Sequence, residues 1–174
     1  MNRRALLHSL LVLPVVPWLA ACSRASNPAP AAGGTAVAPL QKPAEAWRDQ
    51  VSAAAYRVLF EEGTERPYSS PLDREKREGT YICAACYLPL FDSAHKFDSG
   101  TGWPSFTRPI DGHVGMKEDF ALIFPRTEYH CARCGGHQGH VFNDGPPPRG
   151  ERWCNNGVAL DFVPKGGPLP ALRS

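Results

Sequence analysis

The hydrophobic and polar positions divide the chain into three parts. An apolar run at 6–18 is followed by a stretch, 23–43, that is rich in Ala, Pro and Gly and poor in large apolar side chains. Such a stretch buries too little apolar surface to order itself, which predicts a linker. Apolar positions return beyond it, and they predict a folded domain over 44–166 with a short tail over 167–174.

The first segment of this domain has the spacing of an amphipathic helix. The stretch from Glu45 to Phe60 presents one apolar stripe at helical spacing, made of Trp47, Val51, Ala54, Ala55, Val58 and Leu59. The stripe predicts a helix of about four turns. Gly63 supplies a stop signal, and Pro67 and Pro71 then bracket a predicted loop.

After Gly79 the pattern changes to short β-prone runs separated by Gly, Pro and Asp turns. These runs cover residues 80–82, 121–124, 140–142 and 158–163. Three consecutive prolines between Gly145 and Gly150 predict an exposed loop. We therefore predict a mainly β domain of antiparallel strands with one N-terminal helix.

The N-terminal run is typical of an export signal. It begins with two arginines, and its apolar part is too short and too interrupted for a membrane span of about 20 residues. The segment from Leu19 to Cys22 resembles the lipobox of bacterial lipoproteins, which predicts an export signal over 1–22, acylation of Cys22 and a periplasmic, membrane-tethered product. A plain signal peptide cut near Ala21 is the alternative, and the arginine pair also fits twin-arginine export.

Composition narrows the function classes. The 174-residue chain has 19 basic and 17 acidic residues and a net charge of +2, which gives no electrostatic reason to expect nucleic acid or an anionic membrane surface as a partner. Its 18 prolines and 16 glycines disfavour a helical bundle and agree with strands and turns. Six cysteines are too few for a disulfide-dense miniprotein, so their positions matter more than their number.

Four of the cysteines form two Cys-x-x-Cys units, which contain Cys83 with Cys86 and Cys131 with Cys134. Two such units supply the four thiolates of a tetrahedral zinc site, with Zn–S bonds of about 2.3 Å. Two disulfides are the alternative in an oxidising compartment, and a redox-active pair is a weaker one. We favour one structural zinc ion per chain, because paired units of this spacing are specific and a closed site protects its thiolates.

Cys154 is left over once zinc and the lipid anchor are assigned. An odd cysteine in an exported protein is a reactive thiol or an intermolecular disulfide partner, and a buried structural thiol is the plain alternative. Its neighbours are Arg152, Trp153, Asn155 and Asn156. Because a nearby arginine favours the thiolate, we predict a reactive Cys154.

Four segments in order resemble the methionine-R-sulfoxide reductases of the B type. They are GTERPY at 63–68, DSGTGWPSF at 98–106, GHQGHVFNDG at 136–145 and GERWCNN at 150–156. The two Cys-x-x-Cys units also lie where zinc-binding members of that family have theirs. The resemblance covers roughly residues 45–164, and the joint order of the segments makes it specific.

The resemblance implies a fold of two antiparallel sheets, with zinc on the side away from the active site. It implies that the Cys154 thiolate attacks the sulfoxide sulfur, releases methionine and becomes a sulfenic acid. It further implies supporting roles for six residues: protonation of the sulfoxide oxygen by His137 and His140, substrate binding by Trp103 and Asp144, and orientation of substrate and nucleophile by Arg152 and Asn156. The resemblance also implies that the mature protein is a monomer that repairs oxidised methionine in exported proteins.

Each of these residues also has a plainer interpretation. Trp103, which precedes a proline, could be core packing, and His137 and His140 could be zinc ligands if the four cysteines did not already close the shell. Asp144 before a glycine could be a simple turn residue, and Arg152 could pair with a surface acid. Only the tertiary structure separates these alternatives.

One position departs from the family pattern. Many members have a second cysteine, which resolves the sulfenic acid as a disulfide, where this chain has Thr101. We therefore expect a one-cysteine enzyme that an external thiol or a thioredoxin-like protein reduces directly. A zinc cysteine could substitute only by leaving the metal.

Two functions of other classes compete with this prediction. A zinc-ribbon binding module would need a basic or aromatic stripe, which the near-neutral charge does not supply. A general thiol-disulfide oxidoreductase would need a second reactive cysteine near Cys154, and Thr101 removes the obvious one.

Overall fold

The computed structural model describes residues 37–120 and 125–174. The expected export signal with Cys22, most of the expected linker, and the β-prone run at 121–124 lie outside the described residues. Within the described ranges, no helix has both the length and the apolar character needed to cross a membrane.

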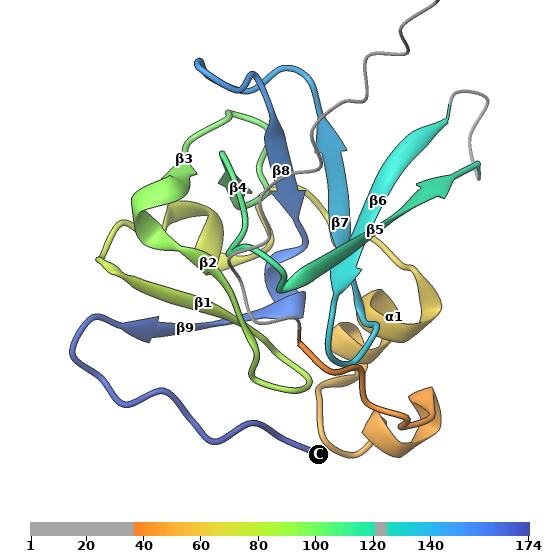
Figure 1. Cartoon of the computed structure of the whole chain (residues 1–174). Helices are drawn as coiled ribbons and strands as arrows, with labels where there is room; N and C mark the ends of the chain where they lie inside the picture. The colour runs from red at the N-terminus through yellow and green to blue at the C-terminus, as the bar shows by residue number, and fades with distance from the viewer. Residues whose placement is uncertain (1–36, 121–124) are drawn as a thin grey trace, which may run out of the picture. The chain divides into compact units, whose positions relative to one another are not determined.

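The described strands form two antiparallel sheets, as predicted (Figure 1). The smaller sheet has the order β2-β1-β9 and contains β1 Gly79–Cys83, β2 Pro89–Asp92 and β9 Leu160–Pro164. The larger sheet has the order β3-β4-β8-β7-β6-β5. Its strands are β3 Lys96–Phe97, β4 Ser105–Phe106, β5 Val114–Asp119, β6 Arg126–Cys131, β7 His137–Phe142 and β8 Arg152–Asn155.

The structure divides the predicted helix into two elements. A 3-10 turn covers Ala44–Trp47, and the α-helix α1 covers Ala53–Glu61. Ser52 separates them, because its side chain accepts a hydrogen bond from the Ala55 amide and so begins a new helix. Glu62 ends α1 in the left-handed conformation, one residue before the predicted stop at Gly63.

The described domain packs beyond both predicted boundaries. Val37 and Leu40 lie against the core, and the Leu40 amide donates to the Arg133 carbonyl over 2.6 Å, so ordered packing begins before residue 44. In the segment expected to be a tail, the Arg173 guanidinium lies 3.8 Å from the centre of the Tyr87 ring and donates to the Gln50 carbonyl over 2.8 Å. The periodicity of apolar residues did not indicate either contact.

The core lies between the two sheets and is largely aromatic. Phe91 from β2 stacks on Phe106 from β4 with ring centres 4.1 Å apart, and Tyr129 from β6 meets Trp153 from β8 edge to face. Trp153 is buried in this core, so the strand's alternation turns its neighbour Cys154 to the opposite face. The core thus determines which face of β8 presents the thiol.

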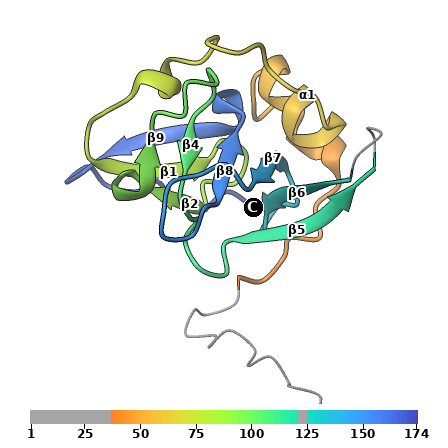
Figure 2. The same cartoon turned by 90° about the horizontal axis from the view of Figure 1, so that it is seen from above.

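The helix α1 packs against β7 and against the 3-10 turn Gly157–Ala159 that follows β8 (Figures 1 and 2). Seen from above in Figure 2, β8 lies between β4 and β7 within the larger sheet. The strand that contains Cys154 is therefore held from two sides.

Candidate active site and metal centre

Cys154 has a cross-strand neighbour on each side. In the strand register it pairs with Ser105 of β4 and with His140 of β7. Residues directly opposite each other in antiparallel strands point to the same face of the sheet. The structure thus brings His140 beside Cys154.

A cavity of about 140 Å³ opens on this face. Its lining is mixed, and the residues are Thr64, Trp103, Arg126, Gly139, His140, Phe142, Cys154, Asn155 and Asn156. A cavity of roughly 150 Å³ holds a benzene-sized molecule, so this one has room for the end of a single side chain. Trp103 lies in this lining half-buried, rather than in the core, and its indole N–H donates to the Glu65 carbonyl over 3.3 Å.

The side chain of Cys154 is half-buried in this mixed setting. Burial raises the pKa of Cys154 above its ordinary value, whereas the Arg152 charge and hydrogen bonding from the Arg152 and Thr101 side chains act in the opposite direction. Arg152 thus favours the thiolate, as expected, but burial outweighs it. Burial thus favours the neutral thiol over the thiolate.

His140 is oriented by an acid at the end of β5. Its Nε2 lies 2.8 Å from Asp119 Oδ2, which also accepts from Arg126 over 2.6 Å. Burial lowers the pKa of His140, and the contact with Asp119 opposes that shift. An imidazole fixed in this way beside a thiol is suited to give a proton to a group that develops negative charge in the cavity.

His137 lies one layer deeper and does not line the cavity. Its ring meets the ring of His140 edge to face, with centres 5.4 Å apart. Its Nδ1 is 3.1 Å from Glu128 Oε1, yet among the described residues neither ring nitrogen has an aligned hydrogen-bond partner. Glu128 is itself buried and pairs with Lys117 over 3.2 Å. His137 thus contacts His140 and does not face the cavity.

Asn156 joins the strand to the loop that precedes β1. Its side-chain oxygen accepts from the Glu65 amide over 3.0 Å, and its side-chain nitrogen donates to the Gln138 carbonyl over 3.0 Å. The buried Glu65 carboxylate accepts from the amides of Gly157 and Val158 in return. Burial raises the pKa of Glu65, and these two amides oppose the shift. Asn156 is therefore held on both sides where it lines the cavity.

Arg152 and Asp144 form a bidentate ion pair with N–O distances of 2.8 and 3.0 Å. The guanidinium also covers the Phe142 ring at 4.3 Å from its centre. Asp144 is mostly exposed and does not line the cavity, so the structure places it behind Arg152 instead. The pair holds Arg152 in place next to the thiol.

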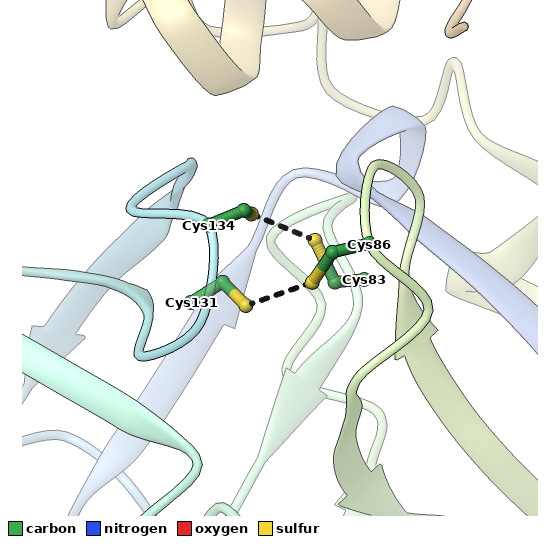
Figure 3. A group of neighbouring side chains, drawn as sticks. All are labelled: Cys83, Cys86, Cys131 and Cys134. Atoms are coloured by element: carbon green, nitrogen blue, oxygen red, sulfur yellow. Dashed lines mark hydrogen bonds between the residues drawn. The ribbon is translucent and has the colours of Figure 1, made fainter. Parts of the chain in front are cut away.

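The predicted zinc ligands form a separate cluster, in which all four sulfur atoms lie within 4.8 Å of one another (Figure 3). The Sγ atoms of Cys83 and Cys134 are 3.6 Å apart, and those of Cys86 and Cys131 are 3.5 Å apart. Tetrahedral zinc with bonds of about 2.3 Å requires sulfur separations of about 3.8 Å. These separations fit the metal and are too long for disulfide bonds of about 2.05 Å.

The two Cys-x-x-Cys turns share one backbone pattern. In each turn the first cysteine's amide donates to the residue five positions on, and its carbonyl accepts from the residue four positions on. That fourth residue has a left-handed backbone in both turns, at Tyr87 and at Gly135. The match indicates two zinc knuckles held ready for one ion. None of the four cysteines lines the cavity at Cys154.

Sequence reasoning missed several residues that shape the site. Glu65 lies in the GTERPY segment, so that segment was a usable signal, whereas Asp119, Arg126 and Glu128 belong to no motif. These three reach the histidines only through the pairing of β5, β6 and β7.

The fold and the site together define a two-sheet β domain that has a four-thiolate metal centre and a separate half-buried thiol beside a histidine pair. Residues 51–164 match the family model of the SelR domain. The chain therefore belongs to the SelR-domain family.

Relatives that share most of their length with this chain bear the name "Peptide methionine sulfoxide reductase MsrB". One from Pseudomonas savastanoi pv. phaseolicola is 50% identical over 127 residues, which cover 72% of this chain and 97% of the relative. One from Bradyrhizobium diazoefficiens is 50% identical over 125 residues, 71% of this chain and 90% of the relative. One from Methanosarcina barkeri is 48% identical over 124 residues, which cover 71% of this chain and 87% of the relative.

Proposed function

We propose that this chain reduces methionine-R-sulfoxide in peptides to methionine. The observation that supports this most directly is the cavity at Cys154, which combines a thiol, an indole and an oriented imidazole in a space sized for one side chain. The membership in the SelR-domain family and the names of the relatives agree with it. An uncharged S-methyl group is recognised by an aromatic face, which Trp103 and Phe142 supply in the cavity lining.

The proposed chemistry uses two electrons of Cys154. The Cys154 thiol gives its proton to His140, and the thiolate attacks the sulfoxide sulfur. The oxygen takes that proton back from His140 and moves to Cys154, so methionine leaves reduced while Cys154 becomes a sulfenic acid. Two external thiols then convert the sulfenic acid back to the thiol and yield water and a disulfide. The pair of Arg152 with Asp144 and the anchored Asn156 keep the nucleophile and substrate aligned. The zinc ion stabilises the fold when bound to its four cysteines.

Incubating the full chain with each methionine sulfoxide epimer in a short peptide, together with a thiol reductant, tests the activity. We expect reduction of the R epimer and none of the S epimer. Reduction of neither epimer by zinc-loaded protein would overturn the proposed function. Comparison with free methionine sulfoxide measures the preference for peptide substrates.

The recycling step should proceed without an internal disulfide. Thr101 lies beside Cys154 and its hydroxyl also lies 2.8 Å from the Ser99 hydroxyl, so the position usual for a resolving thiol has none. One equivalent of substrate without reductant should leave a sulfenic acid at Cys154 that a dimedone-type probe traps. The variant Thr101→Cys should instead form a disulfide with Cys154, since a disulfide needs Cα atoms within about 7 Å.

Mass spectrometry of the oxidised wild-type protein decides this point. A disulfide between Cys154 and a zinc cysteine, with release of zinc, would show that a metal ligand is the resolving residue. The variant Thr107→Cys serves as a control, because Thr107 is hydrogen-bonded to His95 instead of lying at the thiol. It should form no disulfide with Cys154.

We further propose that the protein is exported and lipid-anchored through Cys22, and that it acts as a periplasmic monomer. The support is the sequence alone: two N-terminal arginines, a short apolar run and a lipobox-like segment. Metabolic labelling with a fatty acid should acylate the wild-type chain, and Cys22→Ser should lose the label. Equal labelling of both would contradict the anchor.

A further inference from the structure

One buried hydrogen-bond chain runs from the zinc cluster to the strand of the candidate nucleophile. Gln138 lies in its middle and is fully buried. Its side-chain nitrogen donates to Cys83 Sγ over 3.6 Å, and its side-chain oxygen accepts from Asn155 over 3.3 Å. Asn155 is the residue directly after Cys154, and its own oxygen accepts from the Tyr129 hydroxyl over 2.8 Å.

All the side-chain hydrogen bonds between Tyr129 and Cys83 run in the same direction. Tyr129 donates to Asn155, Asn155 donates to Gln138, and Gln138 donates to Cys83, so the last acceptor is a sulfur of the metal centre. A zinc-bound cysteine is a thiolate, which is the acceptor that such a chain favours. Tyr129, Asn155 and Cys83 are fully buried as well. Water therefore does not replace any of these bonds, and each one constrains its neighbours.

Gln138 also binds the backbone and side chain of Asn156, the second residue after Cys154. Its backbone carbonyl accepts from the Asn156 amide over 2.8 Å and from the Asn156 side chain over 3.0 Å. The Asn155 side chain closes the network by donating to the Asn156 carbonyl over 2.8 Å. Both residues after Cys154 are thus fixed by Gln138, one through its side chain and one through its backbone.

We propose that Gln138 is a positioning residue that transmits the geometry of the zinc centre to Cys154 through Asn155. The inference rests on the proposed function for its effect on turnover, but the link between zinc and thiol stands on the hydrogen bonds alone. In this arrangement the zinc centre does more than hold the sheets together, because its Cys83 sulfur anchors the segment that orients the nucleophile.

The first variant is Gln138→Met, which keeps the length of the side chain and removes both hydrogen bonds. Partners of metal ligands typically change metal affinity or activity by 10–100-fold when replaced. We expect zinc release to a chelator to become roughly tenfold faster, and the single-turnover rate of sulfenic acid formation to fall by a similar factor with little change in KM.

A matched pair of tyrosines separates positioning from stability. Tyr129→Phe removes the other end of the chain without touching the metal, whereas Tyr81→Phe removes a hydroxyl that is equally buried and has no partner among the described residues. Tyr129→Phe should slow sulfenic acid formation and leave zinc release at the wild-type rate. Tyr81→Phe should change neither quantity.

A readout that needs no sulfoxide keeps this test independent of the proposed function. The rate at which iodoacetamide alkylates Cys154 should change at a given pH in Gln138→Met and Tyr129→Phe, and not in Tyr81→Phe. If wild type reduces no sulfoxide but these shifts occur, the proposed function fails and the link stands. If Gln138→Met only melts earlier, with wild-type zinc release, alkylation and single-turnover rates, Gln138 has a purely structural role and the inference is overturned.

Discussion

Two groups of cysteines in the described part of the chain have surroundings that are built in opposite ways. At the metal centre, four cysteines lie on two turns of the same backbone pattern, and three of the four are fully buried. At the cavity, one cysteine lies half-buried on a strand between two polar neighbours, Ser105 and His140. The first region keeps its sulfur atoms away from small molecules, whereas the second opens one sulfur to a space of about 140 Å³.

The surroundings of each cysteine determine the role of its thiol. In the metal centre the four thiolates face one another and need a cation to offset their repulsion. Because they bind the metal, they are not available as nucleophiles. Among the described residues no second thiol lines the cavity at Cys154, and Arg152 and Thr101 are the groups that favour its charged form. Substitutions in the metal centre should therefore reduce stability, whereas substitutions at the cavity should reduce activity.

The largest effect should come from the metal centre. Replacing Cys86 by Ser, or removing zinc with a chelator, should cost on the order of 10 kcal/mol of folding free energy, because the free energy of binding a structural zinc ion adds directly to the stability of the fold. Thermal melting and metal content measure this. A metal-free protein with an unchanged melting temperature and two disulfides by mass would contradict it.

Cys154→Ser should abolish sulfoxide reduction while leaving the zinc content and the melting temperature nearly unchanged. The oxygen of serine cannot form the sulfenic acid on which the proposed reaction depends. Turnover assays and metal analysis on the same preparation check both statements. Wild-type turnover in this variant would show that Cys154 is not the nucleophile.

His140→Ala should slow sulfenic acid formation by roughly 10²-fold, the usual loss for a positioned general acid. His137→Ala should slow it less, because His137 contacts His140 but does not line the cavity. His95→Ala is the control, since that histidine accepts from Arg108 in a different part of the domain. Single-turnover kinetics should rank the three variants in this order, and an effect of His137→Ala larger than that of His140→Ala would reverse their roles.

The pH dependence of Cys154 should follow from its burial. Because burial raises its pKa, alkylation by iodoacetamide should increase with pH with a midpoint above the ordinary cysteine range. Arg152 favours the thiolate, so Arg152→Ala should move the midpoint further upward. Arg149→Ala should not move it, since Arg149 pairs with Glu151 instead. A midpoint at or below the wild-type value in Arg152→Ala would show that Arg152 does not stabilise the Cys154 thiolate.

The smallest effect should come from the segment that covers the first knuckle. Arg173 donates to the Gln50 carbonyl and stacks on Tyr87, the residue with a left-handed backbone after Cys86. Arg173→Ala should lower the free energy of unfolding by about 1–2 kcal/mol, measured by denaturant titration. Arg66→Ala, at an exposed position, is the control and should have no measurable effect.

Local sequence indicated a mainly β domain and the four zinc ligands, and the family resemblance added the two-sheet arrangement. The Cys-x-x-Cys spacing defines a knuckle within a few residues, and alternating β-prone runs identified β1, β7 and β9. The short strands β3 and β4 have two residues each and could not be read from periodicity, because a two-residue run contains no period. The predicted helix was divided at Ser52, since a capping side chain overrides an apolar stripe.

The candidate nucleophile was likewise readable from sequence by counting the cysteines, but its surroundings were not. Asp119, Arg126 and Glu128 reach the histidines from strands distant in the chain, and the ladder of β5, β6 and β7 alone places them there. The pKa of Cys154 also depended on the fold: the neighbouring arginine was visible in the sequence, yet burial outweighed its charge. Sequence thus determined which reactive groups are present, while tertiary structure decided how far each is from water and from its partners, because desolvation and charge pairing act through space rather than along the chain.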